Sequence, residues 1–316
     1  MLEPFYCLGL VLMKRLHTRM SETTFRSFRQ TDTDDFLRLQ ESAFRGLEYI
    51  PRVKVNLSGL DHEGSLIAER DGSMVGSIGL FKLDRPGWFE ISKLAVRDAT
   101  SEDIAKQLVK ILLGNLDSKN PRFLKATTIA VQPYVDIYKS LGFEPVRRSV
   151  RIYWDISRIQ PRPAKFETRE LEKDSADDAA DVWVSGLRPY WDYWIEESGG
   201  AEELKAWTRQ SVINKGQRWL GTFIDRKLVG LAMIRPDSYG HGDARFNGAY
   251  ALPEFRGKGI GSELMNAIIR EAQLLKQKTM RVYTLAFLDH LAPGAVLYLK
   301  SGGKIEAEFL QLEKKP

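Results

Sequence analysis

The apolar positions in the last third of the chain change spacing from strand-like to helix-like and back. The run 244–252 is typical of a strand and ends at Pro253, which cannot donate to a β-ladder. Further strands are predicted at 281–287 and 304–312, with a short helix at 295–302 between them. The first two strands flank a helix whose apolar residues share one face: Ile260, Leu264, Met265, Ile268, Ile269, Ala272 and Leu275.

The pattern upstream predicts more strands and helices of ordinary length. A helix begins at Asp174 or Ser175, where early carboxylates suit the positive end of the helix dipole. The other elements predicted for the second half are a strand at 166–171, a helix at 201–213 and strands at 218–224 and 228–234. Those predicted for the first half are a strand at 24–29, a helix at 33–43 and a hairpin of 66–70 with 75–80.

The hydrophobic pattern occurs twice. Apolar residues at 104, 108, 109, 112 and 113 have the same spacing as those at 260, 264, 265, 268 and 269. Ile137-Tyr138-x-x-x-Gly142 likewise matches Leu297-Tyr298-x-x-x-Gly302, in the same order. We therefore predict a tandem repeat of one α/β domain. The predicted boundaries are an N-terminal extension at 1–22, a first copy at 23–159, a proline-containing linker at 160–165 and a second copy at 166–316.

A glycine-rich turn joins the strand at 244–252 to the following helix. It reads Arg256-Gly257-Lys258-Gly259-Ile260-Gly261-Ser262. Glycine permits positive φ and close approach of a ligand, and a helix N-terminus suits a phosphate. Arg256 and Lys258 add positive charge, so the turn is predicted to hold a pyrophosphate. The alternative is a tight strand–helix connection without a ligand. The spacing does not match a P-loop or a dinucleotide fingerprint.

This strand, turn and helix, followed by Leu297-Tyr298-x-x-x-Gly302, resembles the GNAT superfamily of acyl-CoA-dependent N-acyltransferases. The resemblance implies two GNAT-like domains, each with a mixed, mostly antiparallel sheet flanked by helices. It implies that acetyl-CoA lies along the strand edge Tyr250, Ala251 and Leu252. The backbone N–H of Ala251 or Leu252 would polarise the thioester carbonyl. Main-chain N–H groups of 256–262 would hold the pyrophosphate.

The resemblance also makes Tyr298 the expected general acid. A tyrosine hydroxyl is protonated at neutral pH and can donate to a departing sulfur. The alternative is a tyrosine that only packs beside the coenzyme. The sequence departs from the family near Leu291, where many relatives carry asparagine, and at Gly303, where phenylalanine is usual. The general base stays open between Asp289 or His290, a water-mediated base and a neutral amine, since Asn247 is too weak.

The first copy differs at the glycine turn. Asp103 falls at the position of Gly259, and the loop before it is one residue shorter. A carboxylate would repel a diphosphate, and the missing glycines would block its close approach. We therefore expect the first copy not to bind CoA in the family manner, but to serve as structure or as a wall of the acceptor site. Binding of another ligand there is the alternative.

The segment 187–197 is the predicted acceptor region. It contains four aromatic residues and three carboxylates, which could hold a cationic amine by charge and cation–π contact. Packing between the two copies is an equally open interpretation, because tryptophan and tyrosine are enriched at interfaces.

Composition narrows the class of protein. With 28% charged and 43% hydrophobic residues, the chain has the composition of a globular protein. The single cysteine, Cys7, excludes an internal disulfide and fits a reducing, cytoplasmic compartment. The apolar run 4–13 is too short to cross a bilayer. The net charge of +5 is spread out, so nucleic-acid binding is not expected, and Arg147, Arg148 and Arg151 are interpreted as a solvated strand end.

Together these observations predict a CoA-dependent N-acyltransferase whose active site lies in the second copy. Acetyl transfer from acetyl-CoA to a primary amine, by direct attack and without a metal, is the expected reaction. The acceptor could be a small amine, an amino-sugar conjugate or a protein amine. The alternative is a non-catalytic acyl-CoA-binding or regulatory module.

Overall fold

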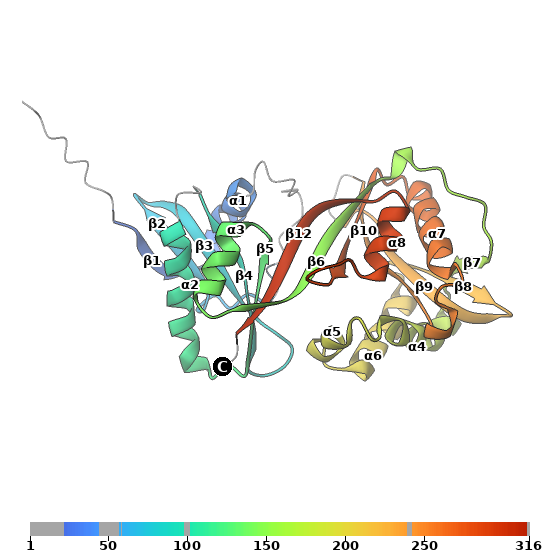
Figure 1. Cartoon of the computed structure of the whole chain (residues 1–316), viewed down its shortest axis with the longest axis horizontal. Coiled ribbons are helices and arrows are strands. Elements are labelled where there is room, and N and C mark those ends of the chain that lie inside the picture. The colour runs from blue at the N-terminus through green and yellow to red at the C-terminus, as the bar shows by residue number, and fades with distance from the viewer. Residues whose placement is uncertain (1–21, 44–56, 58, 98–101, 239–241, 315–316) are drawn as a thin grey trace, which may run out of the picture.

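The computed structural model describes residues 22–43, 57, 59–97, 102–238 and 242–314. They form one continuous twelve-stranded sheet in the order β1-β2-β3-β4-β5-β12-β6-β11-β10-β9-β8-β7. Only the β4·β5 and β10·β11 pairs are parallel, and helices flank the sheet (Figure 1). The predicted α/β class with a mixed, mostly antiparallel sheet is confirmed. No helix in these ranges is both long enough and apolar enough to cross a bilayer.

The two halves repeat one order of elements. The first half contains β1 (Thr24–Ser27), α1 (Thr33–Ala43), β2 (Leu66–Arg70), β3 (Ser73–Lys82), β4 (Trp88–Val96), α2 (Glu102–Leu116), β5 (Phe123–Ile129), α3 (Gln132–Ser140) and β6 (Glu144–Asp155). The second contains β7 (Glu167–Glu170), α4 (Ala176–Leu187), α5 (Asp192–Glu197), α6 (Ala201–Asn214), β8 (Arg218–Ile224), β9 (Lys227–Arg235), β10 (Asp243–Ala251), α7 (Ile260–Leu274), β11 (Thr279–Ala286), α8 (Pro293–Lys300) and β12 (Lys304–Lys314). Most of the predicted extension, with Cys7, lies outside the described residues.

The last strand of each half pairs in the other half. β6 lies antiparallel to β11, with Asp155 opposite Thr279 and Arg148 opposite Ala286. β12 lies antiparallel to β5, with Phe309 opposite Ile129, and also to β6. In Figure 1, β12 therefore runs out of the C-terminal half and into the N-terminal half. The domain boundaries predicted from sequence remain a prediction, but hydrogen bonding between strands crosses them in both directions.

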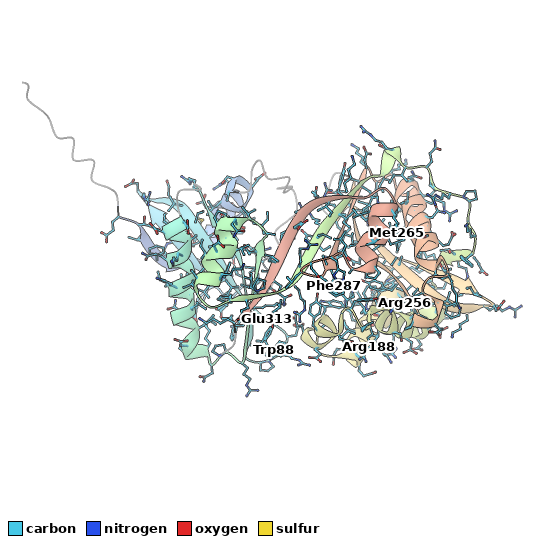
Figure 2. The ribbon with its side chains drawn as sticks, in the orientation of Figure 1. Trp88, Arg188, Arg256, Met265, Phe287 and Glu313 are labelled. Atoms are coloured by element: carbon cyan, nitrogen blue, oxygen red, sulfur yellow. The ribbon has the colours of Figure 1, made fainter. Side chains whose placement is uncertain are left out.

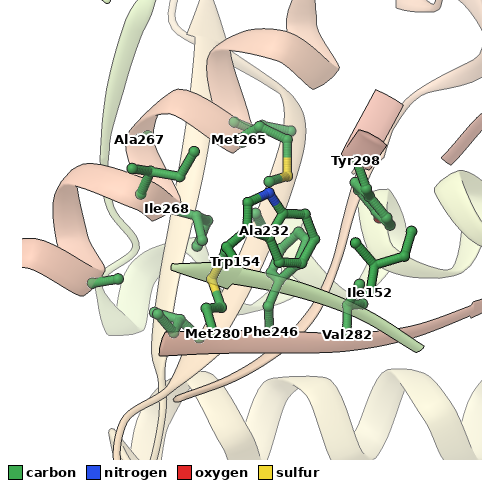
Figure 3. Packing of buried hydrophobic residues seen from close by; sticks show 14 of the residues in the cluster. Ile152, Trp154, Ala232, Phe246, Met265, Ala267, Ile268, Met280, Val282 and Tyr298 are labelled. Carbon is green, nitrogen blue, oxygen red and sulfur yellow. The ribbon is translucent and has the colours of Figure 1, made fainter. Parts of the chain in front are cut away.

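The hydrophobic cores follow this exchange. Val150, Ile152 and Trp154 of β6 are fully buried in the C-terminal core beneath α7 (Figure 3). Leu312 of β12 is fully buried in the N-terminal core, which packs on α2. Each half therefore depends on apolar side chains that the other half's sequence supplies.

The arginine group on β6 is not a solvated strand end, so that interpretation is wrong. Three glutamates of β12 face it across the strand pair: Arg147 pairs with Glu313 at 3.0 Å, Arg148 with Glu308 at 3.6 Å and Arg151 with Glu306 at 2.6 Å. Arg151 is fully buried. The charges are neutralised because the partner strand comes from the far end of the chain, which the local sequence does not show.

We expect Leu312→Ala to destabilise the N-terminal half, although residue 312 is close to the C-terminus. The substitution removes a fully buried side chain from that core and should cost about 2–5 kcal/mol of unfolding free energy. Denaturant unfolding measures the loss, and hydrogen exchange should show faster opening of β2–β5. Leu274→Ala is the control, because Leu274 is 76% exposed. Loss of protection confined to the C-terminal half would contradict the exchange of strands.

Candidate active site

Two central strands of the C-terminal half diverge. β10 and β11 pair in parallel only from Asp243 opposite Thr279 to Arg245 opposite Arg281. Beyond that point β11 continues along β6, while β10 is bent by a bulge between Phe246 and Ala249. Gly248 lies in this bulge at φ +106°, and a Cβ there would come within 2.6 Å of the Tyr250 hydroxyl. On its β11 side, the end of β10 therefore has no strand partner among the described residues.

At this strand end, the backbone N–H groups of Ala251 and Leu252 point to opposite edges of β10. Leu252 donates its N–H to Val229 O on β9 at 3.0 Å, so the amide of Leu252 serves the ladder and cannot polarise a carbonyl. Amide directions alternate along an antiparallel strand, so the Ala251 N–H points to the opposite edge, where β11 has diverged. The Tyr250 hydroxyl donates to Asn247 O at 3.1 Å and its ring packs on Trp183, and Tyr250 also lines the cavity beside this edge.

The glycine turn forms one wall of a cavity beside this edge. Gly257 and Gly259 have φ of +75° and +90°, and Gly259 is the N-cap of α7. The first three amides of α7, at 260–262, have no partner within the helix. The cavity has a volume of about 390 Å³, and Gly257, Gly259, Gly261 and Ser262 are among its lining residues. Ile260 instead buries its side chain in the core, and Lys258 lies over the Phe255 ring.

The Arg256 side chain connects the glycine turn to α4. Its guanidinium donates to Gly186 O at 3.0 Å and to Arg188 O at 2.5 Å, at the C-terminus of α4. A cation here satisfies helix carbonyls that lack an intrahelical partner. Figure 2 shows Arg256 and Arg188 close together in the C-terminal half. The side chain therefore fastens the glycine turn to α4, although Arg256 also lines the cavity.

Tyr298 of α8 is a buried residue in the lining of the same cavity. Its hydroxyl accepts a hydrogen bond from the Ala249 N–H at 2.9 Å, and the side chain is packed between Trp154 and Phe246. Burial raises the pKa of Tyr298 to about 12, against the lowering effect of the Ala249 amide. Because the amide engages the hydroxyl oxygen, the phenolic proton is directed elsewhere. The residue is a protonated acid at the end of the cavity.

The structure does not bring a base into the cavity. Among the described residues, no aspartate, glutamate or histidine lines it. His290 and Asp289 form a pair at 2.7 Å, which lowers the pKa of Asp289, but the His290 side chain is 62% exposed. His290 stacks on Phe287, which in turn contacts Tyr190 in the cavity wall. Asn247 contacts the Met233 sulfur instead. The assignment of the base therefore stays open.

The segment 187–197 has two functions along its length. Tyr190 and Trp191 line the cavity, as the acceptor interpretation requires. Tyr193 lies under the Arg147 guanidinium, at 3.7 Å from its ring centroid, and Glu197 pairs with Lys125 at 2.5 Å. The beginning of the segment therefore belongs to the candidate site, and the end of it packs against the N-terminal half.

The first copy fills the equivalent space with a side chain of its own. Aligning Tyr138 of α3 with Tyr298 of α8 sets Pro133 against Pro293 and Tyr134 against Gly294. Gly294 lines the cavity of the second copy. The Tyr134 hydroxyl instead bonds to the main chain of Val96, which lowers its pKa against a larger rise from burial. Val96 ends β4 as Ala251 ends β10. Part of the first copy's turn, at 98–101, lies outside the described residues.

Comparisons with known proteins agree with this geometry. The model described as the acetyltransferase (GNAT) family matches residues 182–296. The sequence matches no curated protein. A GCN5-related N-acetyltransferase of Sphaerobacter thermophilus is similar in structure, with a TM-score of 0.69 and 14% identity over 93% of this chain and 96% of that one.

Two other solved structures have the same fold. A tandem GNAT protein from the clavulanic acid biosynthesis pathway gives a TM-score of 0.60 and 14% identity, covering 93% of this chain and 98% of that one. A glucosamine N-acetyltransferase region of a fungal multi-domain β-N-acetylglucosaminidase gives 0.64 and 11%, covering 93% and 38%. At these identities the likeness concerns the fold.

Proposed function

From the GNAT acetyltransferase domain that the chain contains at 182–296, we propose an N-acyltransferase whose active site is the cavity between β10, α7 and α8. The donor is acetyl-CoA and the acceptor a primary amine. One observation carries the proposal: the Ala251 amide faces a gap between diverging strands, with the glycine turn on one side and the Tyr298 hydroxyl on the other.

The residues present fit an acyl-CoA thioester. Amides of Ile260, Gly261 and Ser262 would hold the diphosphate at the positive end of the α7 dipole. The glycines at 257 and 259 allow the main chain to approach it, since their φ values are positive. The unpaired edge of β10 would hold the pantetheine amides as an added strand does.

In the proposed reaction, the Ala251 N–H stabilises the negative charge that develops on the thioester oxygen. The amine nitrogen forms a bond to the carbonyl carbon, and the bond from that carbon to sulfur breaks. Tyr298 donates its proton to the departing sulfur. The proton lost by the amine returns through water to the Tyr298 oxygen, which a pKa of about 12 makes a strong base. The products are an amide and the free thiol, and the tyrosine is restored.

The second candidate function is a non-catalytic acyl-CoA-binding module. It is favoured by the lack of a carboxylate or imidazole in the lining among the described residues. The deciding experiment is incubation of the protein with acetyl-CoA and a panel of primary amines while thiol release is followed. Amine-dependent release supports the transferase. Thermal stabilisation by acetyl-CoA without release would favour the module.

We expect Gly259→Asp to weaken acetyl-CoA binding by at least about tenfold. The new residue must adopt φ +90° and places a carboxylate beside the diphosphate, so strain and repulsion act together. Calorimetry measures the dissociation constant. Lys227→Ala is the control, because Lys227 is an exposed cation paired with Glu254 outside the cavity lining. Unchanged affinity in Gly259→Asp would contradict the proposed location of the diphosphate.

A further inference from the structure

A second cavity lies where the two halves meet, and the proposed transferase mechanism does not use it. This interdomain cavity has a volume of about 410 Å³. Its lining comes from the end of β3, from β4 and β5 in the first copy, and from α5 in the second. The polar residues that the argument uses are Glu90, Ser92, Lys93, Lys125, Glu197 and Ser198.

Lys93 brings a positive charge to this cavity and forms no salt bridge among the described residues. Three lysines line it. Lys125 is bound by Glu197 at 2.5 Å and Glu90 at 3.5 Å, and Lys82 by Asp61 at 3.4 Å. Lys93 has no ion-pair partner among the described residues, and burial lowers its pKa against the opposing effect of the Glu90 carboxylate. A buried ammonium without a partner is costly, so an anionic ligand would stabilise it.

The backbone at Lys93 is also unfavourable for a lysine. Lys93 has φ +60° in the bulge of β4, where register shifts between Ser77 and Gly79. The equivalent bulge of β10 has Gly248 at φ +106°. Glycine adopts positive φ without strain, whereas lysine does not. The first copy thus carries a strained cationic side chain at a position where the second copy has no side chain at all.

We propose that the interdomain cavity is a binding site for a small carboxylate, whose anionic group pairs with the Lys93 ammonium. We expect the ligand to carry a single negative charge, because Lys125 is already held by two glutamates and Asp84 also lines the cavity. The hydroxyls of Ser92 and Ser198 can hydrogen-bond a hydroxyl or amino group on the ligand. The class is therefore a small hydroxy acid or amino acid.

This site shares a helix with the acyl-CoA cavity. Trp194 of α5 lines the interdomain cavity, while Trp191, the N-cap of the same helix, lines the other. The two tryptophan rings pack edge to face at 6.4 Å. A ligand that orders Trp194 therefore acts on a residue in contact with the wall of the proposed active site.

Calorimetric titration of the full-length protein with 3-hydroxybutyrate and with L-serine, in the absence of acyl-CoA, tests the proposal. We expect saturable binding of at least one probe below ~20 mM. Lys93→Gly should weaken it by at least about tenfold and, by relieving the backbone strain, should raise the melting temperature of the unliganded protein. Lys93→Met should weaken binding equally while retaining the bulk of the side chain.

Lys110→Gln is the control, since Lys110 is an exposed lysine of α2 that lies outside the cavity lining. It should bind the probe as the wild type does. The proposal is overturned if neither probe binds, or if Lys93→Gly and Lys93→Met bind as tightly as the wild type. Because no acyl-CoA is present, these outcomes are independent of whether the protein proves to be a transferase.

Discussion

Replacing Tyr298 with phenylalanine should lower kcat by about 10²–10⁴-fold while leaving acetyl-CoA affinity within a few-fold of wild type. In the proposed mechanism the phenol protonates the departing sulfur, and the ring, packed by Trp154 and Phe246, remains in the variant. Steady-state thiol release measures kcat, and calorimetry measures binding. A variant with unchanged kcat would show that Tyr298 only packs beside the coenzyme.

The first copy supplies a matched control. Tyr138 occupies the equivalent position, fully buried, and its hydroxyl has no hydrogen-bond partner among the described residues. Tyr138→Phe should leave kcat unchanged, and it should keep or raise stability, by up to ~1 kcal/mol, because it removes an unpaired buried hydroxyl.

The pH profile offers a second readout for Tyr298. The pKa of about 12 keeps the hydroxyl protonated throughout the neutral range. Activity that depends on this acid should therefore fall only as the pH approaches 12 from below. A fall in rate near neutral pH would have to come from the amine or from another group.

Gly294→Tyr should abolish acetyl-CoA binding, with an increase in Kd of at least about 100-fold. The substitution reproduces in the second copy the tyrosine that fills the first. A Cβ at residue 294 lies 3.7 Å from the Thr284 hydroxyl, an ordinary contact, so the fold should accept it. The ring must then occupy the cavity that Gly294 lines. Calorimetry measures the loss, and an unchanged melting temperature shows that the fold is intact.

Stoichiometry completes this test. The wild type should bind one acetyl-CoA per chain, and Gly294→Ala, which adds only a methyl group at contact distance, should bind nearly as well. Tyr134→Gly should not create a second site, since Asp103 remains where the second copy has Gly259. Two coenzymes per wild-type chain would contradict the inference that Tyr134 closes the first copy.

The sequence predicted the local elements well because their signals are local. Helical spacing located α7, which begins at Ile260, and the flanking proline located the end of β10 at Ala251. The paired motifs of Tyr138 and Tyr298 gave the repeat. Pairing between strands depends on residues far apart in the chain, so the sequences of β6 and β12 do not indicate that each pairs with strands of the other half. The same limit explains why the arginines of β6 were misinterpreted.

The main-chain features of the candidate site could be predicted from the sequence, whereas the contacts of its side chains could be predicted less well. Glycines at 257 and 259 indicate positive φ from their identity alone, and the structure has them so. Arg256 could not be placed, because its acceptors are carbonyls about 70 residues upstream. Gly294 was missed, although aligning Pro133 with Pro293 would have set it against Tyr134. Neither the sequence nor the structure identifies a general base.

The reciprocal placement of β6 and β12 makes the chain resemble a strand-exchanged dimer whose two subunits are covalently joined. If the chain were cut between its halves, the same hydrogen bonds would join two separate polypeptides into a closed pair, each lending its final strand to the other. Covalent joining makes that pair permanent at any concentration. Because the two copies no longer have to be identical, only one of them needs an open cavity. The first copy can therefore carry Tyr134 where the second copy has Gly294.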